Sequence, residues 1–214
     1  MKNRLLGRLT VLATVRIVIV VVDVELGLVA GQDTARATLV EAPSGHPLQA
    51  VLHHLVAADI RAMEQTAARL DLRAVASAAE AVAGARRVDI CGTGDSALVA
   101  AEIQACLHGI GVAAWYWRDV HDGLASAATL GAGDVAFGVS QSGRAPETVE
   151  IVAEAASRGA RTVALTAFAA SPLADVADVV LLTAVPPTAG AVRHPQLLVL
   201  DLLAVAVGRL RRAG

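Results

Sequence analysis

The chain has 214 residues, of which 55% are hydrophobic and 18% charged, so a disordered protein is excluded and a sizeable core is expected. The formal net charge is −2 and aromatic residues make up 2%, which argues against a basic phosphate-backbone grip or an aromatic base-stacking surface. Two cysteines, Cys91 and Cys106, form neither a disulfide framework nor a CxxC pair, a usage typical of the reducing cytoplasm.

Residues 1–46 read as an atypical N-terminal segment and linker. An apolar run over residues 17–30 follows several basic residues, but Asp23 and Glu25 lie inside it. The run is also shorter than the roughly 20 apolar residues that a membrane span needs, so no membrane contact is predicted. The β-branched stretch 17–22 favours an edge strand, and the polar residues 32–47 favour a linker.

Residues 47–84 predict a helical lead-in. Pro47 suits the first turn of a helix, and apolar residues recur behind it at helical spacing as far as Leu70. Asp71 then suits the N-cap of a second helix, which Gly84 ends.

Residues 85–214 alternate short apolar runs with helical patterns. The predicted strands are 88–91, 112–117, 134–140, 162–166 and 178–182, and the later helices are 96–108, 146–158 and 195–210. Strands and helices that alternate at this spacing predict right-handed crossovers and a parallel sheet covered on both faces. The predicted fold class is therefore α/β, a doubly wound sheet preceded by helices.

Two loops in this pattern are suited to bind an anion. One follows the first strand and the other follows the third, and ligands of such sheets lie beyond the carboxyl ends of the strands. Their glycines allow close backbone approach, and their hydroxyls can donate to phosphate oxygens. The candidate ligand-binding residues are Gly92, Thr93, Gly94, Ser96, Ser140, Gln141, Ser142, Gly143 and Glu147.

A dinucleotide site is an alternative interpretation of the first loop. Gly92, Gly94 and Ala97 satisfy the G-x-G-x-x-[GA] fingerprint, and Asp119 follows the second strand at about the distance of a ribose-binding acid. The second loop, however, is richer in hydroxyls than a dinucleotide site requires.

The two loops and their surroundings resemble a SIS (sugar isomerase) domain. The resemblance rests on Gly92–Ser96, Leu130–Val135, Ser140–Arg144, Ala155–Leu165 and Ser171–Ala174. It implies a flavodoxin-like three-layer fold with a five-stranded parallel sheet, a phosphosugar ligand, and a homo-oligomer, either dimer or tetramer.

The flanking segments are similar to those of RpiR-type (MurR/RpiR) transcriptional regulators. The segments concerned are 63–87 and 196–203. The resemblance implies that the domain senses a sugar phosphate while a helix-turn-helix binds DNA. The segment before Pro47 lacks a trihelical pattern, so the helix-turn-helix is expected to be missing or truncated, and DNA binding is expected only if one is supplied upstream. The sequence departs from the family at Ala145, usually Thr, and at Asp95, whose charge Arg144 or Arg118 could offset.

An aldose–ketose isomerase is the alternative function that the resemblance implies. Such an enzyme needs a base, and Glu147, His121 and His194 are the candidates. Glu147 also suits the first turn of its helix, His121 suits a solvated loop, and His194 suits a helix boundary. The favoured interpretation is a non-catalytic sensor that uses no cofactor and no metal.

Overall fold

The computed structural model describes residues 21–23, 36–38, 47–185 and 193–213. The chain divides into two compact units, residues 1–57 and 58–214. In the first unit, β1 (Val21–Asp23) pairs antiparallel with β2 (Arg36–Thr38). The edge strand predicted over 17–22 thus coincides with β1 at two residues, and the rest of that prediction lies outside the described residues. The segment 32–47 predicted as a linker contains β2, and residues 32–35 and 39–46 of it lie outside the described residues.

The second unit is built on a five-stranded parallel sheet of order β4-β3-β5-β6-β7. The strands are β3 (Arg87–Cys91), β4 (Ala114–Trp117), β5 (Asp134–Val139), β6 (Arg161–Thr166) and β7 (Val179–Leu182). All four pairings are parallel, as predicted. The chain passes from β3 to β4 on one side and then to β5 on the other, so the strand order reverses between β3 and β5.

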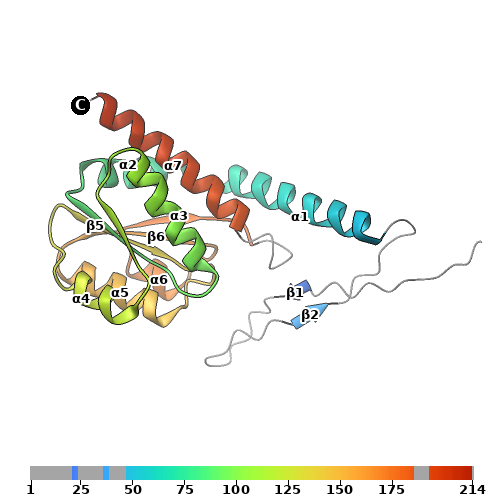
Figure 1. Ribbon diagram of the computed structural model, residues 1–214, viewed down its shortest axis with the longest axis horizontal. Helices are drawn as coiled ribbons and strands as arrows, with labels where there is room; N and C mark the ends of the chain where they lie inside the picture. The colour runs from blue at the N-terminus through green and yellow to red at the C-terminus, as the bar shows by residue number, and fades with distance from the viewer. Residues whose placement is uncertain (1–20, 24–35, 39–46, 186–192, 214) are drawn as a thin grey trace, which may run out of the picture. The chain divides into compact units, whose positions relative to one another are not determined.

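Helices cover both faces of the sheet and complete three layers (Figure 1). One face packs against α2 (Leu72–Gly84), α3 (Ser96–Gly109) and α7 (Arg193–Ala213). The other packs against α4 (Val120–Ala127), α5 (Pro146–Ser157) and α6 (Pro172–Asp175). Strand residues alternate between the layers: Ile90 and Phe137 join the first core, whereas Cys91 and Ala136 join the second.

The predicted helical lead-in is present as α1 (Pro47–Arg69) and α2. Asp71 is the N-cap of α2, as predicted, and its carboxylate accepts from the Arg73 amide at 2.8 Å. Thr66 of α1 is fully buried, and its hydroxyl accepts from the Ala184 amide at the end of β7. This bond fastens the second half of α1 to the sheet.

Two short helices differ from the sequence prediction. The stretch after β4, predicted as a solvated loop around His121, is the helix α4, because the Asp119 carboxylate caps it by accepting from the His121 and Asp122 amides. The stretch before β7 contains α6, which Ser171 caps. No helix within the described ranges is long and apolar enough to cross a membrane.

Candidate functional site

The two predicted loops lie side by side at one edge of the sheet. They follow β3 and β5, which are hydrogen-bonded neighbours, at the point where the strand order reverses. In doubly wound sheets this is where the crevice for a ligand opens. The structure therefore brings together the residues that the sequence analysis assigned to one site.

The first loop turns tightly from β3 into α3. A Cβ atom at Gly92 would lie 3.1 Å from the Ser96 carbonyl and 3.2 Å from the Val139 carbonyl, so the packing favours glycine there. Gly94 has a φ of +57° and open space beside it. The Thr93 and Ser96 side chains are half-buried, and their hydroxyls form no hydrogen bond among the described residues.

The end of β4 flanks the first loop. The Tyr116 hydroxyl donates to the Gly92 carbonyl at 3.1 Å, and the Arg118 guanidinium lies 6.0 Å from the Tyr116 ring centroid. Burial raises the pKa of Tyr116 above its ordinary value, so the hydroxyl stays protonated and able to donate at neutral pH. Arg118 is exposed and carries positive charge to this side of the loop.

The second loop is held closely by its own backbone. The Gly143 amide donates to the Ser140 carbonyl at 3.1 Å, and Gly143 has a φ of +66°. A Cβ atom there would lie 2.2 Å from the Ser171 hydroxyl oxygen, so no other residue fits without a shift. Among the described residues, the Ser140 and Ser142 hydroxyls accept long bonds alone, from the Ala145 amide at 3.5 Å and from the Arg144 amide at 3.3 Å.

The helices that follow these loops begin without a side-chain cap. Asp95 precedes α3 and Ala145 precedes α5, and neither side chain bonds a helix amide. In contrast, α2, α4 and α6 are capped by Asp71, Asp119 and Ser171. Uncapped helix starts beside glycine-rich loops form a favourable place for an anion.

Glu147 lies in the first turn of α5, half-buried at the same edge. His194 lies in the first turn of α7, where its Nδ1 is 3.0 Å from a carboxylate oxygen of Asp59. This position agrees with the helix-boundary role suggested by the sequence. His121 points from α4 into solvent.

One residue of this edge was missed by sequence reasoning. Gln196, on the first turn of α7, is 1% exposed, and its Nε2 donates to Oε1 of Gln141 at 3.0 Å. A glutamine in an otherwise apolar helical stripe was the available signal, because a buried amide needs a partner.

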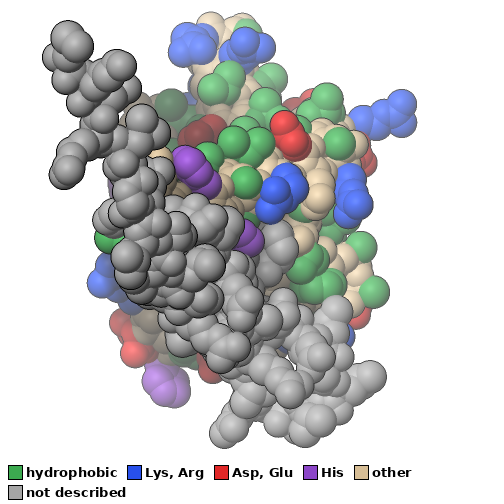
Figure 2. Space-filling model, turned by 90° about the vertical axis from the view of Figure 1, so that its right-hand side faces the viewer, with side chains coloured by type: hydrophobic (Ala, Val, Ile, Leu, Met, Phe, Trp, Pro, Cys, Tyr) green, Lys and Arg blue, Asp and Glu red, His purple; other side chains and the backbone are tan. Residues whose placement is uncertain are grey.

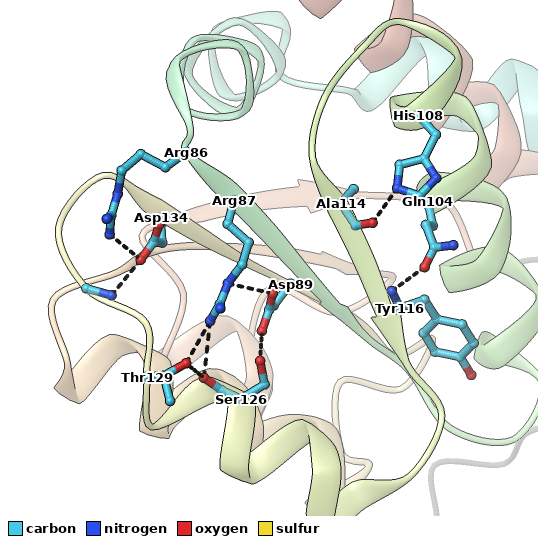
Figure 3. Close-up of polar contacts among 11 residues, drawn as sticks. Arg86, Arg87, Asp89, Gln104, His108, Ala114, Tyr116, Ser126, Thr129 and Asp134 are labelled. Carbon is cyan, nitrogen blue, oxygen red and sulfur yellow. Dashed lines mark hydrogen bonds and ion pairs between the residues drawn. The ribbon is translucent and has the colours of Figure 1, made fainter.

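The opposite edge of the sheet carries the stronger ionic contacts (Figure 3). Arg86 pairs with Asp134 at 2.8 Å, and Arg87 lies 3.1 Å from the buried Asp89. An open hollow at this edge is lined by Glu80, Asp134 and Arg161, among others. Asp134 there is already engaged by Arg86 and by the Gly131 amide, so the hollow offers no free carboxylate cluster. Within the described ranges no cluster of three metal-ligating side chains is found.

Beneath the first loop, the last residue of β3 is an inert thiol. Cys91 is buried, and its sulfur lies 3.8 Å from the Phe137 carbonyl oxygen. Burial, with a smaller contribution from the Asp89 charge, raises the pKa of Cys91 to about 12. Cys91 is therefore a core residue and not a nucleophile.

The SIS domain family model matches residues 81–206 of the chain. An uncharacterized HTH-type transcriptional regulator from Caldanaerobacter subterraneus is 35% identical over 167 residues, which are 76% of this chain and 59% of the relative. The chain therefore spans less than two thirds of that relative's length.

Solved structures give the same result for the fold. The Vibrio vulnificus NanR protein complexed with ManNAc-6P has a TM-score of 0.73 at 27% identity, over 76% of this chain and 64% of that one. The sugar isomerase domain of an RpiR transcription factor from Sphaerobacter thermophilus has a TM-score of 0.68 at 27% identity, over 76% and 92%. A phosphoheptose isomerase from Neisseria gonorrhoeae, 24% identical over 75% of this chain and 99% of that one, shares the fold with a TM-score of 0.65.

Proposed function

The chain belongs to the SIS domain family, and on that premise we propose that its two paired loops bind a sugar phosphate at the carboxyl edge of the sheet. The observation that carries the proposal is the pair of hydroxyl-bearing loops, on adjacent strands, that lead into the uncapped helices α3 and α5. Backbone amides and helix dipoles there favour a dianion, and serine hydroxyls can donate to its oxygens. The proposed ligand-binding residues are Gly92, Thr93, Gly94, Ser96, Ser140, Gln141, Ser142, Gly143 and Glu147.

The departure at Ala145 shapes the proposed site. Alanine at the N-cap of α5 supplies no hydroxyl, so the Ser140 and Ser142 side chains must provide the donors on this side. Asp95 is exposed at the first loop, and the exposed Arg118 and Arg144 are basic groups that could offset its charge. We expect affinity for the phosphate to depend strongly on the two serines.

The domain is proposed to act as the effector-sensing part of an RpiR-type regulator in the cytoplasm. The regulator name of the Caldanaerobacter relative and the similarity to a solved RpiR domain support this role. DNA binding by an assembly that contains this domain is proposed only where a helix-turn-helix is present upstream.

A homo-oligomer is part of the same proposal. Leu198, Leu202 and Val205 recur on one stripe of α7 and are 36%, 38% and 51% exposed. Figure 2 shows hydrophobic side chains at the surface between basic ones on the face it presents. An exposed apolar stripe on a helix is typical of an association surface.

Isomerase activity is the second candidate function, and Glu147 is the observation that favours it. Its carboxylate lies on the first turn of α5 at the proposed site and could serve as a base. His194, another candidate base, is already paired with Asp59. We therefore place sensing ahead of catalysis.

A thermal-shift screen separates these functions. Sugar phosphates are tested as ligands, with NAD and NADP as controls for the dinucleotide alternative, and each hit is incubated and analysed for isomerised product. A ligand at 100 times its Kd raises the free energy of unfolding by about 2.7 kcal/mol. We expect stabilisation by a sugar phosphate without turnover. Turnover would establish the isomerase, and a response to NAD or NADP alone would refute the phosphosugar site.

A further inference from the structure

Gln141 lies between the two serines of the second loop in the sequence, and its side chain has one protein partner among the described residues. Its Oε1 accepts from Nε2 of Gln196 at 3.0 Å. The Nε2 group of Gln141 has no bond within the described ranges, although it is a double donor.

The backbone of Gln141 is fixed separately from its side chain. Its carbonyl oxygen accepts from the Ala167 amide at 3.0 Å and from the Thr166 hydroxyl at 3.2 Å, both at the end of β6. The loop therefore holds its place without Gln196. The side-chain amide of Gln141 is engaged by Gln196 at its oxygen end, so the nitrogen end is the one left free.

Gln196 is itself held in place. It is 1% exposed within α7, which packs against α2 and α3, and the neighbouring His194 is tied to Asp59 of α1. Because Gln196 on α7 donates to the oxygen end of the Gln141 amide, the nitrogen end of that amide remains for another partner.

We propose that Gln196 is a positioning residue that sets the polarity of the ligand site: by donating to Gln141 Oε1, it directs Gln141 Nε2 toward an acceptor oxygen of the bound phosphosugar. This assignment rests on the proposed function and deepens it. A phosphate or sugar oxygen accepts from an amide N–H, whereas the reversed amide would present its carbonyl oxygen to an anion and repel it.

The test compares affinities of purified full-length variants for inorganic phosphate, glucose 6-phosphate and ManNAc-6P by calorimetry. Gln196→Met keeps the length of the side chain and removes the donor, so we expect about a fivefold loss of affinity, the value of one neutral hydrogen bond. Gln196→Glu can only accept, which reverses the Gln141 amide, so its loss should exceed that of Gln196→Met. Gln65→Glu, the same charge change at an exposed position of α1, should bind as the wild type does.

A double-mutant cycle distinguishes positioning from general structural support. If Gln196 acts through Gln141, then Gln196→Met added to Gln141→Met lowers affinity no further. An equal loss in both backgrounds would overturn the proposal, as would unchanged affinity of Gln196→Met for every probe that the wild type binds. Because a buried glutamate could impair folding, circular dichroism is recorded for each variant, and the methionine cycle decides if Gln196→Glu does not fold. Failure of the wild type to bind any probe would instead refute the proposed function, and this inference with it.

Discussion

The two edges of the parallel sheet use polar residues in opposite ways. At the amino edge, polar side chains contact one another: Arg86 hydrogen-bonds Asp134, Ser126 hydrogen-bonds Asp89, and Arg87 forms an ion pair with Asp89 (Figure 3). The two atoms of that ion pair, Arg87 Nε and Asp89 Oδ1, form no hydrogen bond among the described residues. At the carboxyl edge, the hydroxyls of the two loops have at most long local bonds to the residues that the structure describes, and α3 and α5 begin uncapped.

This difference separates stability from binding. A buried polar group gains stability from a protein partner, so a satisfied network contributes to the fold and offers little to a ligand. At the opposite edge, hydroxyls that have no partner or only a long bond within the described part of the chain can bind a ligand at little cost in protein bonds. We therefore expect substitutions at the amino edge to lower stability and substitutions at the carboxyl edge to lower affinity.

The largest effect is expected from Asp89→Ala. Asp89 is 3% exposed and accepts from Ser126 beside the guanidinium of Arg87. Its removal leaves this partly buried cation with neutral oxygens of Ser126 and Thr129 but without the carboxylate that balances its charge. We expect a loss of about 3 kcal/mol in the free energy of unfolding, measured by urea denaturation. Glu154→Ala removes an exposed partner of Arg158 on α5 and should cost less than about 1 kcal/mol. Two outcomes would contradict the expectation that the amino edge serves stability and the carboxyl edge serves binding. One is an equal loss of unfolding free energy in the two variants, and the other is a weaker affinity for sugar phosphate in Asp89→Ala.

Gly143→Ala tests whether the second loop has a fixed shape. The left-handed backbone and the contact with Ser171 should together cost about 2 kcal/mol or more. Gly94→Ala is the matched control, because Gly94 has a similar φ but open space, and it should cost about 1 kcal/mol. The two unfolding curves, measured under the same conditions, isolate the contact with Ser171. If the two substitutions lower the free energy of unfolding by the same amount, Ser171 does not pack against Gly143 as the structure shows.

Ser96→Ala and Ser142→Ala should change binding and spare stability. Each removes a hydroxyl of a proposed ligand loop, and a hydrogen bond to a charged group is worth about tenfold in affinity or more. Titration calorimetry with the sugar phosphate identified in the screen measures the loss, and thermal unfolding of the free variants should stay close to that of the wild type. Thr129→Ala, at the opposite edge, should leave affinity unchanged. Unaltered affinity in both serine variants would remove these loops from the site.

Cys91 and Cys106 should react with thiol reagents at different rates in the folded protein. With its pKa raised to about 12, Cys91 holds thiolate at pH 8 on the order of one part in ten thousand, whereas Cys106 is partly exposed on α3. Burial and the neighbouring Glu102 raise the pKa of Cys106 as well, so its advantage comes from exposure. A thiol reagent should therefore label Cys106 before Cys91, and Cys91 only after unfolding, as mass spectrometry can show.

The raised pKa of Cys91 also sets a pH dependence. Above the ordinary pKa of 9.0 the unfolded thiol ionises while the folded thiol stays neutral, so the contribution of Cys91 to stability falls between pH 9 and about 12. The variant Cys91→Ala should lose less stability than the wild type over that range. Rapid labelling of Cys91 in the folded protein would contradict its burial beneath the first loop.

The sequence predicted the elements that carry their own signals. Apolar runs predicted all five strands of the sheet, and Asp71 predicted the start of α2. Both signals depend only on residues that are close together in the sequence. The sequence did not predict α4, since its eight residues carry too little periodicity, and the capping by Asp119 becomes visible only in the folded turn.

The arrangement of the candidate site was predicted in part for the same reason. Its loops followed from glycine and serine spacing after two strands, and their adjacency followed from the rules of parallel sheets. The bond between Gln141 and Gln196 joins residues 55 positions apart, which no local pattern specifies.

The most direct test of the central claim is a two-dimensional NMR titration of the isotopically labelled chain with ManNAc-6P and inorganic phosphate. The account predicts that the perturbed amides cluster in Gly92–Ser96 and Ser140–Glu147 and that those of Arg86, Gly133 and Asp134 stay unchanged. Perturbations concentrated at the amino edge, or none in the two loops when the ligand is bound, would contradict it.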